Sequence, residues 1–533
     1  MEIDLNQFEL VVKRIEEKAW SEGRLLSNPS DSVLKELTGK EPEAKETEYD
    51  NFVVESEPTS RAAMFTKNSI DYPFGEEELK LLAQAEKYLS REKLILIDRV
   101  VGNENSGISA RLIVPERFAH VALGGGNLQI PTKGEIDSPT YQILMFFDEA
   151  FEKNKSKPLS QKDITIRLSH LDDGRMIKII RNSNYIGEWK KGIFAGEDWR
   201  VKLKKKGIFL HAGCREDYLL SAKGEYQTVR SLIVALSANG KTTLTCRILA
   251  RKGKEKSWVI QDDGGTLAPD GSFYGFEKGG IYAKTESVNP KEQIEIFYGL
   301  HKPDTLLENV YVDKEGDFDF YNLTRTSNGR AVIRRRDFLH ASPYIDVGRI
   351  DNLILISRGS LLPAISKLTP EQAAFLMVDG RAMESSAGDP TQAGRIRSEF
   401  FYDPFVAGNR AEHANNFYEI IKGLPHLNCY LINTGGIGEG EQYKNISVGD
   451  TLAILDSLFR GGLGPEDWLS APTGFQVPKA VRAVDDIYFH PEKLYSAGEF
   501  EERQKELNRM RWEAIEKVGS GLHQNIKKAF ERH

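Results

Sequence analysis

Apolar residues recur along the chain at two spacings, and each spacing predicts a different element. Residues 5–20 carry apolar positions at helical spacing and predict an amphipathic helix: Leu5, Phe8, Val11, Val12 and Ile15. From residue 51 to 210, short apolar runs recur between turns and predict a strand-rich α+β domain: NFVVE, KLILIDRVV, ARLIVP, YQILMFF, ITIRLS, MIKIIR and GIFLHAG. Residues 38–50 are polar and acidic, which predicts a loop.

The pattern changes at about residue 228. A buried strand, SLIVAL, leads into a glycine-containing loop, and the next stretch, KTTLTCRILAR, predicts a helix over 241–251. Further strands are predicted at SWVIQDD, LENVYVD, NLILISR and CYLINTG, and the charged tail, 496–532, is predicted to be helical. This half is therefore expected to be a mixed sheet with flanking helices, built around a nucleotide loop, and the fold class is α/β of the mixed α+β kind.

Length, charge and cysteine content narrow the class of protein. A chain of 533 residues is too long for one core, so two domains are expected. The net charge of −7 argues against a nucleic-acid partner, whose phosphates need a basic face. The three cysteines are widely spaced, which suits a reducing cytoplasm. The charged N-terminus does not resemble a signal peptide, and no run of about 18 apolar residues predicts a membrane helix.

Residues 235–243, ALSANGKTT, are a candidate phosphate-binding loop. The last four residues fit the pattern G-x-x-x-x-G-K-[ST], but Ala235 stands where that pattern has glycine. A strand leads in and a helix leads out, so backbone N–H groups would face a polyphosphate, Lys241 would reach its β- and γ-phosphates, and Thr242 would face Mg²⁺. The alternative, a helix start that binds no ligand, stays open. The candidate nucleotide-binding residues here are Leu236, Ser237, Ala238, Asn239, Gly240, Lys241, Thr242 and Thr243.

Three other features could carry chemistry. Asp262-Asp263 ends an apolar strand, where paired carboxylates hold hard cations but also form turns. His211 ends another strand, and such a histidine is more often a core residue than a ligand. The lysine pair Lys190-Lys191 lies between apolar and glycine residues, a setting in which lysine can lose its proton and become a ligand.

The order of these features is more specific than any one of them. The series YIGEWKKG, the strand ending in His211, the loop, the strand ending in Asp262-Asp263 and FEKGGIYAKTE resembles the ATP-dependent phosphoenolpyruvate carboxykinases, as a divergent member. Further matching stretches are LENV from Leu307, Asn328-Gly-Arg330, IDNLILISRGSLLPAISKLTPEQAAF and LINTGGIGEG followed by NISVGDTLAILDSL. The resemblance implies a two-lobed fold, with an N-terminal α/β substrate-side domain at 1–206 and a C-terminal nucleotide-binding domain at 207–533.

The resemblance also implies roles for individual residues. It places Mn²⁺ on Lys191, His211 and Asp263, and assigns ATP and Mg²⁺ to Lys241 and Thr242. The catalytic set that it implies is Lys190, Lys191, Ser237, Lys241, Asp262, Asp263 and Arg330. The substrate-binding set is Arg61, Tyr185 and Arg330, and the nucleotide-binding set extends to Asn445 and Thr451. In this set Asn445 stands where the family has an arginine, and Thr451 matches a position near the adenine.

The implied activity is that of a lyase and kinase that converts oxaloacetate and ATP into phosphoenolpyruvate, ADP and CO₂, as in gluconeogenesis. Drift around the motifs, such as Gly264-Gly265 after the aspartate pair, keeps two alternatives open. One is a kinase on the same scaffold that phosphorylates another small-molecule or protein acceptor, and the other is a non-catalytic nucleotide-binding regulator. The expected ligands are ATP, Mg²⁺, Mn²⁺ and small-molecule substrates. No nucleic-acid or membrane partner is expected, and the protein is expected to be a monomer or small homo-oligomer.

Overall fold

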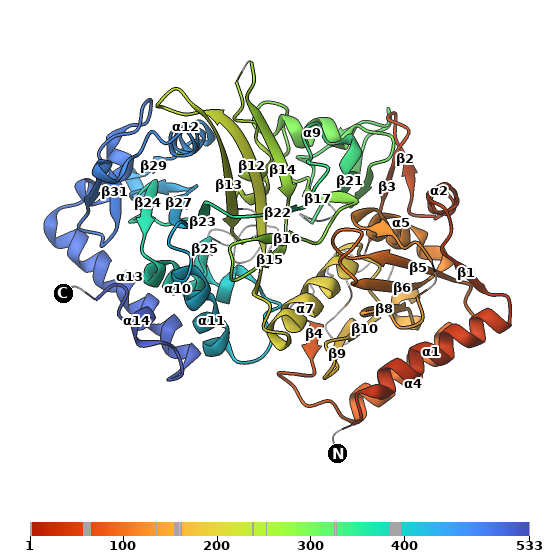
Figure 1. Cartoon of the computed structure of the whole chain (residues 1–533). Coiled ribbons are helices and arrows are strands. Elements are labelled where there is room, and N and C mark those ends of the chain that lie inside the picture. Colours follow the sequence, from red (N-terminus) through yellow and green to blue (C-terminus); the bar gives the residue numbers. More distant parts are fainter. Residues whose placement is uncertain are drawn as a thin grey trace. The chain divides into compact units, whose positions relative to one another are not determined.

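The computed structural model describes residues 3–56, 65–134, 136–153, 159, 163–236, 239–251, 253–324, 326, 328–383 and 396–531. The chain divides into two compact units, and Figure 1 labels many of their elements. Unit 1 contains Met1–Lys205 and Phe276–Leu339, and unit 2 contains Lys206–Gly275 and His340–His533. The predicted domains, 1–206 and 207–533, differ from these units in the segment 276–339. That segment groups with unit 1 because its strand β18 (Leu306–Glu308) pairs with β3 (Phe52–Val54).

The larger sheet of unit 1 has the order β1-β5-β6-β8-β10-β9-β4, with β7 beside β5. Its strands are β1 (Leu25–Ser27), β4 (Thr66–Asn68), β5 (Leu94–Val100), β6 (Ser109–Pro115), β7 (Ile130–Pro131), β8 (Tyr141–Phe146), β9 (Thr165–His170) and β10 (Met176–Arg181). Helices α1 (Asn6–Ser21) and α4 (Glu76–Leu89) pack on one face, where Phe8 and Leu82 join Leu96 and Leu144 in one core. The predicted helix over 5–20 is confirmed as α1.

Helices α5 (Ala119–Leu128) and α7 (Gly187–Leu203) pack on the alternate side chains of the same strands. Gly126 lies against Ile97, and Gly192 lies against Ile143, at distances that leave no room for a larger residue. Because alternate strand residues point to opposite faces, Leu96 and Leu144 belong to the first layer and Ile97 and Ile143 to the second. The start of α7, which carries the lysine pair, is thereby fixed on the sheet.

The second sheet of unit 1 has the order β17-β21-β18-β3-β2. It consists of β2 (Lys45–Glu46), β3, β17 (Gly280–Lys284), β18 and β21 (Arg330–Arg334), and the remaining elements are α2 (Asp31–Gly39), α6 (Glu149–Lys153), α9 (Ile294–Leu300) and the β19 (Tyr311–Val312) and β20 (Phe318–Asp319) pair. The strand predicted over 307–313 is broken at Asn309, whose φ is 59°. The predicted loop over 38–50 contains the end of α2 and strand β2.

Unit 2 is built on a mixed sheet with the order β14-β12-β13-β23-β27-β24-β31-β30. Its strands are β12 (Ala212–Leu220), β13 (Tyr226–Val234), β14 (Lys256–Gln261), β23 (Asn352–Ser357), β24 (Ile365–Leu368), β27 (Asn428–Asn433), β30 (Trp468–Ser470) and β31 (Gln476–Pro478). Strands β13, β23 and β27 are parallel, and β12 runs antiparallel to both β13 and β14. The sequence-based fold class, mixed α/β with a mixed sheet in the C-terminal part, is confirmed.

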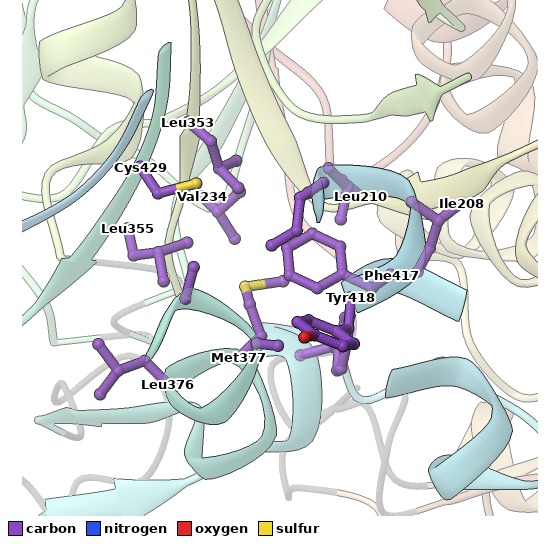
Figure 2. Packing of buried hydrophobic residues seen from close by; sticks show 14 of the residues in the cluster. Ile208, Leu210, Val234, Leu353, Leu355, Leu376, Met377, Phe417, Tyr418 and Cys429 are labelled. Atoms are coloured by element: carbon purple, nitrogen blue, oxygen red, sulfur yellow. The ribbon is translucent and has the colours of Figure 1, made fainter. Parts of the chain in front are cut away.

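Each face of this sheet is covered by helices. Helices α10 (Pro370–Asp379) and α11 (Arg410–Lys422) pack on one face, where Figure 2 shows Met377 and Phe417 beside Val234 and Leu353. Helix α12 (Val448–Phe459) packs on the other face, in the core that contains Ile354. Apolar side chains on both faces explain the uninterrupted apolar runs SLIVAL and NLILIS, because a sheet covered on both sides needs them at every position.

The remaining elements of unit 2 are short or terminal. They are α8 (Lys241–Cys246), α13 (Ala497–Val518), α14 (Gln524–Lys527), β11 (Ile208–Leu210), β15 (Gly265–Leu267), β16 (Phe273–Gly275), β22 (Asp346–Val347), β25 (Arg381–Met383), β26 (Ile396–Ser398), β28 (Gly436–Ile437) and β29 (Lys444–Asn445). Within the described ranges, no helix combines the length and apolarity needed to cross a membrane.

Two predicted helices were too long. The helix predicted over 241–251 ends at Cys246, because the N–H groups of Leu249 and Ala250 both donate to the Ser257 hydroxyl at 3.0 Å rather than to helical carbonyls. The helical tail is interrupted at Gly519, whose φ of 94° ends α13.

Candidate active site

The strand directions of unit 2 bring the predicted nucleotide and metal residues to one edge of its sheet. The loop follows the carboxyl end of β13, and Asp262-Asp263 follow the carboxyl end of β14, which runs in the same direction. His211 immediately precedes β12, whose antiparallel course puts its start at this edge. Ligands of open α/β sheets bind at the carboxyl ends of the strands. Residues from three segments of the sequence therefore meet where a ligand is expected.

Gly240 determines how the loop enters α8. It is the N-cap residue and has φ 94°, a left-handed conformation that side chains other than glycine's rarely adopt. A methyl group at this position would meet nothing closer than Thr434, at 4.0 Å, so conformation rather than space requires glycine here. The loop is also held from the neighbouring strand end, because the Thr434 hydroxyl donates to the Asn239 carbonyl at 2.9 Å. The backbone of Asn239 and Gly240 is thus fixed at the start of a helix, as a phosphate site requires.

Lys241 and His211 both contact the carboxylate of Asp263. The Lys241 ammonium forms an ion pair with Asp263 Oδ1, and its side chain is only 6% exposed. His211 Nε2 lies 3.0 Å from the same oxygen. This contact settles the location of three predicted site residues: the aspartate that ends the β14 segment, the lysine of the loop and the histidine before β12 form one cluster.

The geometry around His211 suits a divalent cation. Its Nδ1 lies 3.3 Å from the Tyr402 carbonyl, an acceptor that fixes the ring with Nε2 toward Asp263. Two ligand atoms bound at right angles, each about 2.1 Å from a cation, are separated by about 3.0 Å, which is the observed spacing of Nε2 and Oδ1. Among the described residues, no three His, Cys, Asp or Glu side chains gather as a metal group.

The other predicted residues of unit 2 that the structure describes lie on elements other than those of the Asp263 cluster or beside that cluster in sequence. Asp262 is buried behind the edge, with the Cys246 thiol 4.0 Å from its Oδ1. Thr242 and Thr243 lie in the first turn of α8. Thr451 is buried in the first turn of α12, donating to the Ser447 carbonyl at 3.2 Å, whereas Asn445 is exposed on β29. Ser237 and Ala238 lie outside the described residues, as does Arg61 of unit 1.

Lys190 and Lys191 lie in the first turns of α7 in unit 1. Gly187 is required at this start, because a methyl group there would lie 2.3 Å from the Tyr185 ring. Lys190 is 3% exposed and its ammonium lies 3.1 Å from Glu277. The Lys191 ammonium lies 4.8 Å from the centre of the Tyr185 ring and 3.5 Å from Glu188. Lys191 is the lysine predicted to bind a metal. Its side chain is 25% exposed, and it is therefore more exposed than that of Lys190.

Charges around this lysine pair are balanced by buried acids. Glu188 contacts both Lys191 and the buried Lys178, whose ammonium donates to it at 2.7 Å. Burial opposes ionisation of Glu188, but the two lysines outweigh it and lower the pKa of that carboxyl. Burial also lowers the pKa of the Lys178 ammonium, against the opposing effect of Glu188. The start of α7 is therefore a compact array of buried charges.

Arg330 and Tyr185 are brought into the same neighbourhood of unit 1 by the second sheet. Arg330 pairs with Glu308 across the antiparallel β18–β21 ladder. Glu308 accepts a hydrogen bond from the Ile186 N–H at 2.9 Å and another from the Tyr282 hydroxyl at 3.3 Å. Burial, followed by the neighbouring Tyr185 and Glu308, raises the pKa of Tyr282. Both predicted residues are thus connected to the buried Glu308. Arg330 lies opposite it in the strand pairing, and Tyr185 precedes Ile186, whose N–H donates to it.

Several residues of these clusters were not singled out from the sequence. Glu277 and Glu308 lie inside the stretches FEKGG and LENV, whose resemblance was noted without a role for either acid. In unit 2, Arg358 Nε lies 3.4 Å from the Thr434 hydroxyl that holds the loop. Arg358 and Thr434 follow the ends of β23 and β27, so their place beside the loop depends on strand order, which no local motif encodes.

A buried histidine supports the segment that carries Tyr185. His120 Nδ1 lies 2.6 Å from Glu41, and its Nε2 lies 2.9 Å from the Asn184 carbonyl. Burial lowers the basicity of this ring, but Glu41, with help from Glu308 and the Asn184 carbonyl, raises its pKa from 6.5 to about 9. At neutral pH the ring is therefore an imidazolium that can donate to both oxygens.

The pair of His120 and Glu41 makes the free energy of unfolding depend on pH. Since the pKa of His120 is higher in the folded chain, its contribution is fully present below about pH 6.5 and is lost as the pH rises through about 9. We expect His120→Gln to lower the melting temperature at pH 6, and the difference from the wild type to shrink by pH 10. Calorimetry across this range measures it, with His301→Gln as the control. A difference that stays constant or grows with pH contradicts the assignment.

Comparison with known proteins identifies the family. The family model described as phosphoenolpyruvate carboxykinase matches residues 7–487. Three relatives named phosphoenolpyruvate carboxykinase (ATP) are similar over most of their length. The Chelativorans protein is 26% identical over 92% of this chain and 86% of its own. The Aeropyrum pernix protein is 26% identical over 91% and 93%, and a Campylobacter jejuni protein is 27% identical over 89% and 86%.

Proposed function

The chain belongs to the phosphoenolpyruvate carboxykinase family, and we propose that the residues described above carry its activity, the ATP-dependent conversion of oxaloacetate to phosphoenolpyruvate. The observation that carries the proposal is the convergence of Lys241 and His211 on Asp263 at the loop edge of the unit 2 sheet. A phosphate-clamping lysine and two candidate cation ligands in one cluster are what phosphoryl transfer needs.

The reaction has two chemical parts. Oxaloacetate loses CO₂ when the bond to its departing carboxylate breaks, and the electron pair stays behind as an enolate. The enolate oxygen then attacks the γ-phosphorus of ATP, and the bond from that phosphorus to the bridging oxygen breaks as ADP leaves. Both parts develop negative charge that fixed positive groups can stabilise.

We assign the nucleotide to the loop and α8. The backbone N–H groups around Gly240 and the start of the helix would bind the β- and γ-phosphates. Lys241 is held by Asp263 when no phosphate is bound and would exchange that partner for a phosphate oxygen. Thr242 lies in the same turn, and Thr451 at the start of α12 is proposed beside the adenine. The roles of Leu236, Ser237, Ala238, Asn239, Thr243 and Asn445 in nucleotide binding stay predictions.

We propose that His211 and Asp263 bind one divalent cation, and that Thr242 binds a second cation, which accompanies the nucleotide. The 3.0 Å between His211 Nε2 and Asp263 Oδ1 fits two ligands of one ion. A bound Mn²⁺ or Mg²⁺ supplies Lewis-acid stabilisation of developing negative charge. The Tyr402 carbonyl fixes the His211 ring for this role, and Asp262 lies behind the edge as a further buried carboxylate. The role of Lys191 as an additional ligand, and the distinction between Mn²⁺ and Mg²⁺, stay predictions.

We assign to the cationic side chains of unit 1 the role of stabilising the negative charge of the substrate and of the transferred phosphoryl group. The ammonium of Lys190 is oriented by the buried Glu277, at 3.1 Å, so its position is fixed. Glu308 accepts a hydrogen bond from the N–H of Ile186, the neighbour of Tyr185, and lies opposite Arg330 in the strand pairing. Arg61 is the predicted partner of the substrate carboxylate.

Replacing Arg330 with lysine is expected to lower kcat by roughly 10²-fold, because one charged donor cannot reproduce the planar fork of a guanidinium. Binding of ATP in the absence of oxaloacetate should be nearly unchanged. Steady-state kinetics and a nucleotide titration measure the two effects. Arg336→Lys is the matched control, since the Arg336 side chain is 63% exposed in the same unit. Equal kcat values in Arg330→Lys and the wild type would remove Arg330 from the catalytic set.

The activity can be tested by supplying oxaloacetate with ATP, GTP or pyrophosphate, each with Mn²⁺ or Mg²⁺. A coupled assay that consumes phosphoenolpyruvate should respond to ATP. If no phosphoenolpyruvate forms with any donor, the proposal fails, and an acceptor panel would then distinguish another kinase from a nucleotide-binding regulator.

The cellular compartment and the metabolic role of the enzyme are also part of the proposal. We infer a cytoplasmic enzyme of gluconeogenesis, since Cys214, Cys246 and Cys429 are buried as thiols, which suits a reducing compartment. That it binds small molecules follows from its family. That it has no nucleic-acid or membrane partner, and that it is a monomer or small homo-oligomer, stay predictions.

A further inference from the structure

Unit 2 contains a cavity of about 940 Å³ to which the catalytic assignment gives no ligand, although its lining includes Arg358 and also Tyr402, whose carbonyl faces His211. It is lined by α13, by the end of α10, by β25 and by the segment that follows β23. Among the described residues, its wall includes neither the loop that carries Lys241 nor Asp263. A volume of this size is in the range of small-molecule binding sites, roughly 300 to 1,000 Å³.

The wall of this cavity contains the buried arginine Arg511 of α13. Arg511 is 3% exposed, and its buried Nε has no hydrogen-bond partner among the residues that the structure describes. Its guanidinium lies against aromatic rings, 4.5 Å from the centre of Phe530 and 5.5 Å from that of Phe475. Burial lowers the pKa of Arg511 to about 10, so the group is still charged at neutral pH. A buried charge with an unpaired donor is costly, which favours any anion that can bind to it.

The charge of Arg511 is only partly balanced within the wall. Arg381 is also buried, and its Nη2 lies 3.2 Å from Asp379 Oδ1. Asp379 interacts electrostatically with Arg511 as well. Burial raises the pKa of Asp379, while the two arginines lower it. Two guanidinium groups thus share one carboxylate, which leaves this cluster of three buried side chains with an excess of one positive charge.

Apart from the buried Asp379, the acidic residues of the wall are exposed: Glu439, Glu499, Glu502 and Glu506. Glu506 forms an ion pair with Arg509 at 2.7 Å, and Glu439 forms one with Arg503. Apolar side chains also line the cavity, namely Leu361, Leu376, Leu431, Leu507 and Met510. The wall therefore combines apolar side chains with the buried cluster of Asp379, Arg381 and Arg511.

We propose that this cavity binds a small amphiphilic anion, with a carboxylate or phosphate head on Arg511 and Arg381 and an apolar body along the leucines. Two guanidinium groups can hold such a head through charge-assisted hydrogen bonds. The contrasting explanation is that Asp379, Arg381 and Arg511 are a structural ion cluster that attaches α13 to α10. That explanation predicts lower stability when Arg511 is replaced but no ligand.

The probes are octanoate, octyl phosphate and uncharged octanol, titrated calorimetrically into the full-length protein with saturating Mg²⁺ and ADP to fill the nucleotide site. One molar equivalent of either anion should bind, and octanol should bind at least 10-fold more weakly. The anion that binds more tightly identifies the head group. Failure of both anions to bind, or equal binding of octanol, would overturn the proposal.

Variants connect this binding to the cavity. Arg511→Met should weaken binding of the preferred anion at least 10-fold, and Arg349→Met, which removes a 61% exposed arginine of the same unit, should leave it unchanged. If Arg511→Met does not fold, Leu507→Trp provides a second test, because it fills the cavity and keeps every charge; it should also weaken binding at least 10-fold. Unchanged binding in the folded Arg511→Met protein, or in Leu507→Trp, would place the anion elsewhere and contradict the assignment.

Discussion

Lys241→Ala is expected to lower kcat for phosphoenolpyruvate formation by about 10³-fold. The residue is 6% exposed and lies at the start of α8, so its ammonium would act on the phosphates with little screening by water. Removing one fixed group that stabilises transition-state charge costs about 10²- to 10³-fold in kcat, and this lysine carries a full charge. Stopped assays of phosphoenolpyruvate at saturating oxaloacetate and ATP measure the effect.

The control for this variant is Lys223→Ala, which removes an exposed lysine from a turn of the same unit. It should retain wild-type kcat. Lys241→Ala leaves the contact of His211 with Asp263 in place, so its far-ultraviolet circular dichroism should match the wild type. A folded Lys241→Ala protein with normal turnover would show that the loop does not bind the reacting phosphates.

His211→Ala is expected to raise the Mn²⁺ concentration for half-maximal activity by about 100-fold, while the Kd for ATP without metal changes by less than about 3-fold. Even indirect support of a metal ligand is typically worth 10- to 100-fold in affinity or activity, and a direct ligand should reach the upper end. The large effect follows from geometry, because Nε2 is held toward Asp263 by the Tyr402 carbonyl.

The matched control is His426→Ala, which removes a half-buried histidine elsewhere in unit 2. Manganese titrations monitored by activity and by Mn²⁺ electron paramagnetic resonance give two independent readings of the cation site. If both titrations are the same for His211→Ala and the wild type, the cation lies elsewhere, whatever the result for Lys241.

Local patterns predicted much of the fold. The helical spacing of Phe8, Val12 and Ile15 predicts α1, and the runs SLIVAL and NLILIS predict β13 and β23. Both runs are apolar at every position because each strand is covered on both faces. Element ends were less predictable. The helix after Lys241 ends at Cys246, since hydrogen bonds to Ser257, a residue of the next strand, replace the helical ones.

The assignment of 276–339 to unit 1 could not be predicted from local patterns. It depends on the parallel pairing of β18 with β3, which joins residues about 250 positions apart in sequence. The same pairing places Glu308 beneath Ile186, and so positions Tyr185. A motif can mark LENV as a resemblance, but the contact that gives its glutamate a role arises only when distant strands pair.

In the candidate site, too, the sequence predicts the residues, but their arrangement depends on the fold. The sequence predicts Lys241, His211 and Asp263 as chemically capable residues, and strand direction brings them into one cluster. Nothing in the local sequence predicts that the lysine and histidine share one carboxylate oxygen. Arg358 and Thr434 were missed for the same reason, because only the neighbouring positions of β13, β23 and β27 place them beside the loop.

The central claim is that this chain joins decarboxylation of oxaloacetate to phosphoryl transfer from ATP at the site that contains Lys241. Phosphorus-31 NMR of a reaction with oxaloacetate, ATP and Mn²⁺, stopped with chelator at intervals, follows every phosphorus-containing species together. We expect phosphoenolpyruvate and ADP to accumulate in a one-to-one ratio with the wild type, and neither to accumulate with Lys241→Ala. Formation of ADP with inorganic phosphate but without phosphoenolpyruvate, or equal phosphoenolpyruvate from both proteins, would contradict the claim.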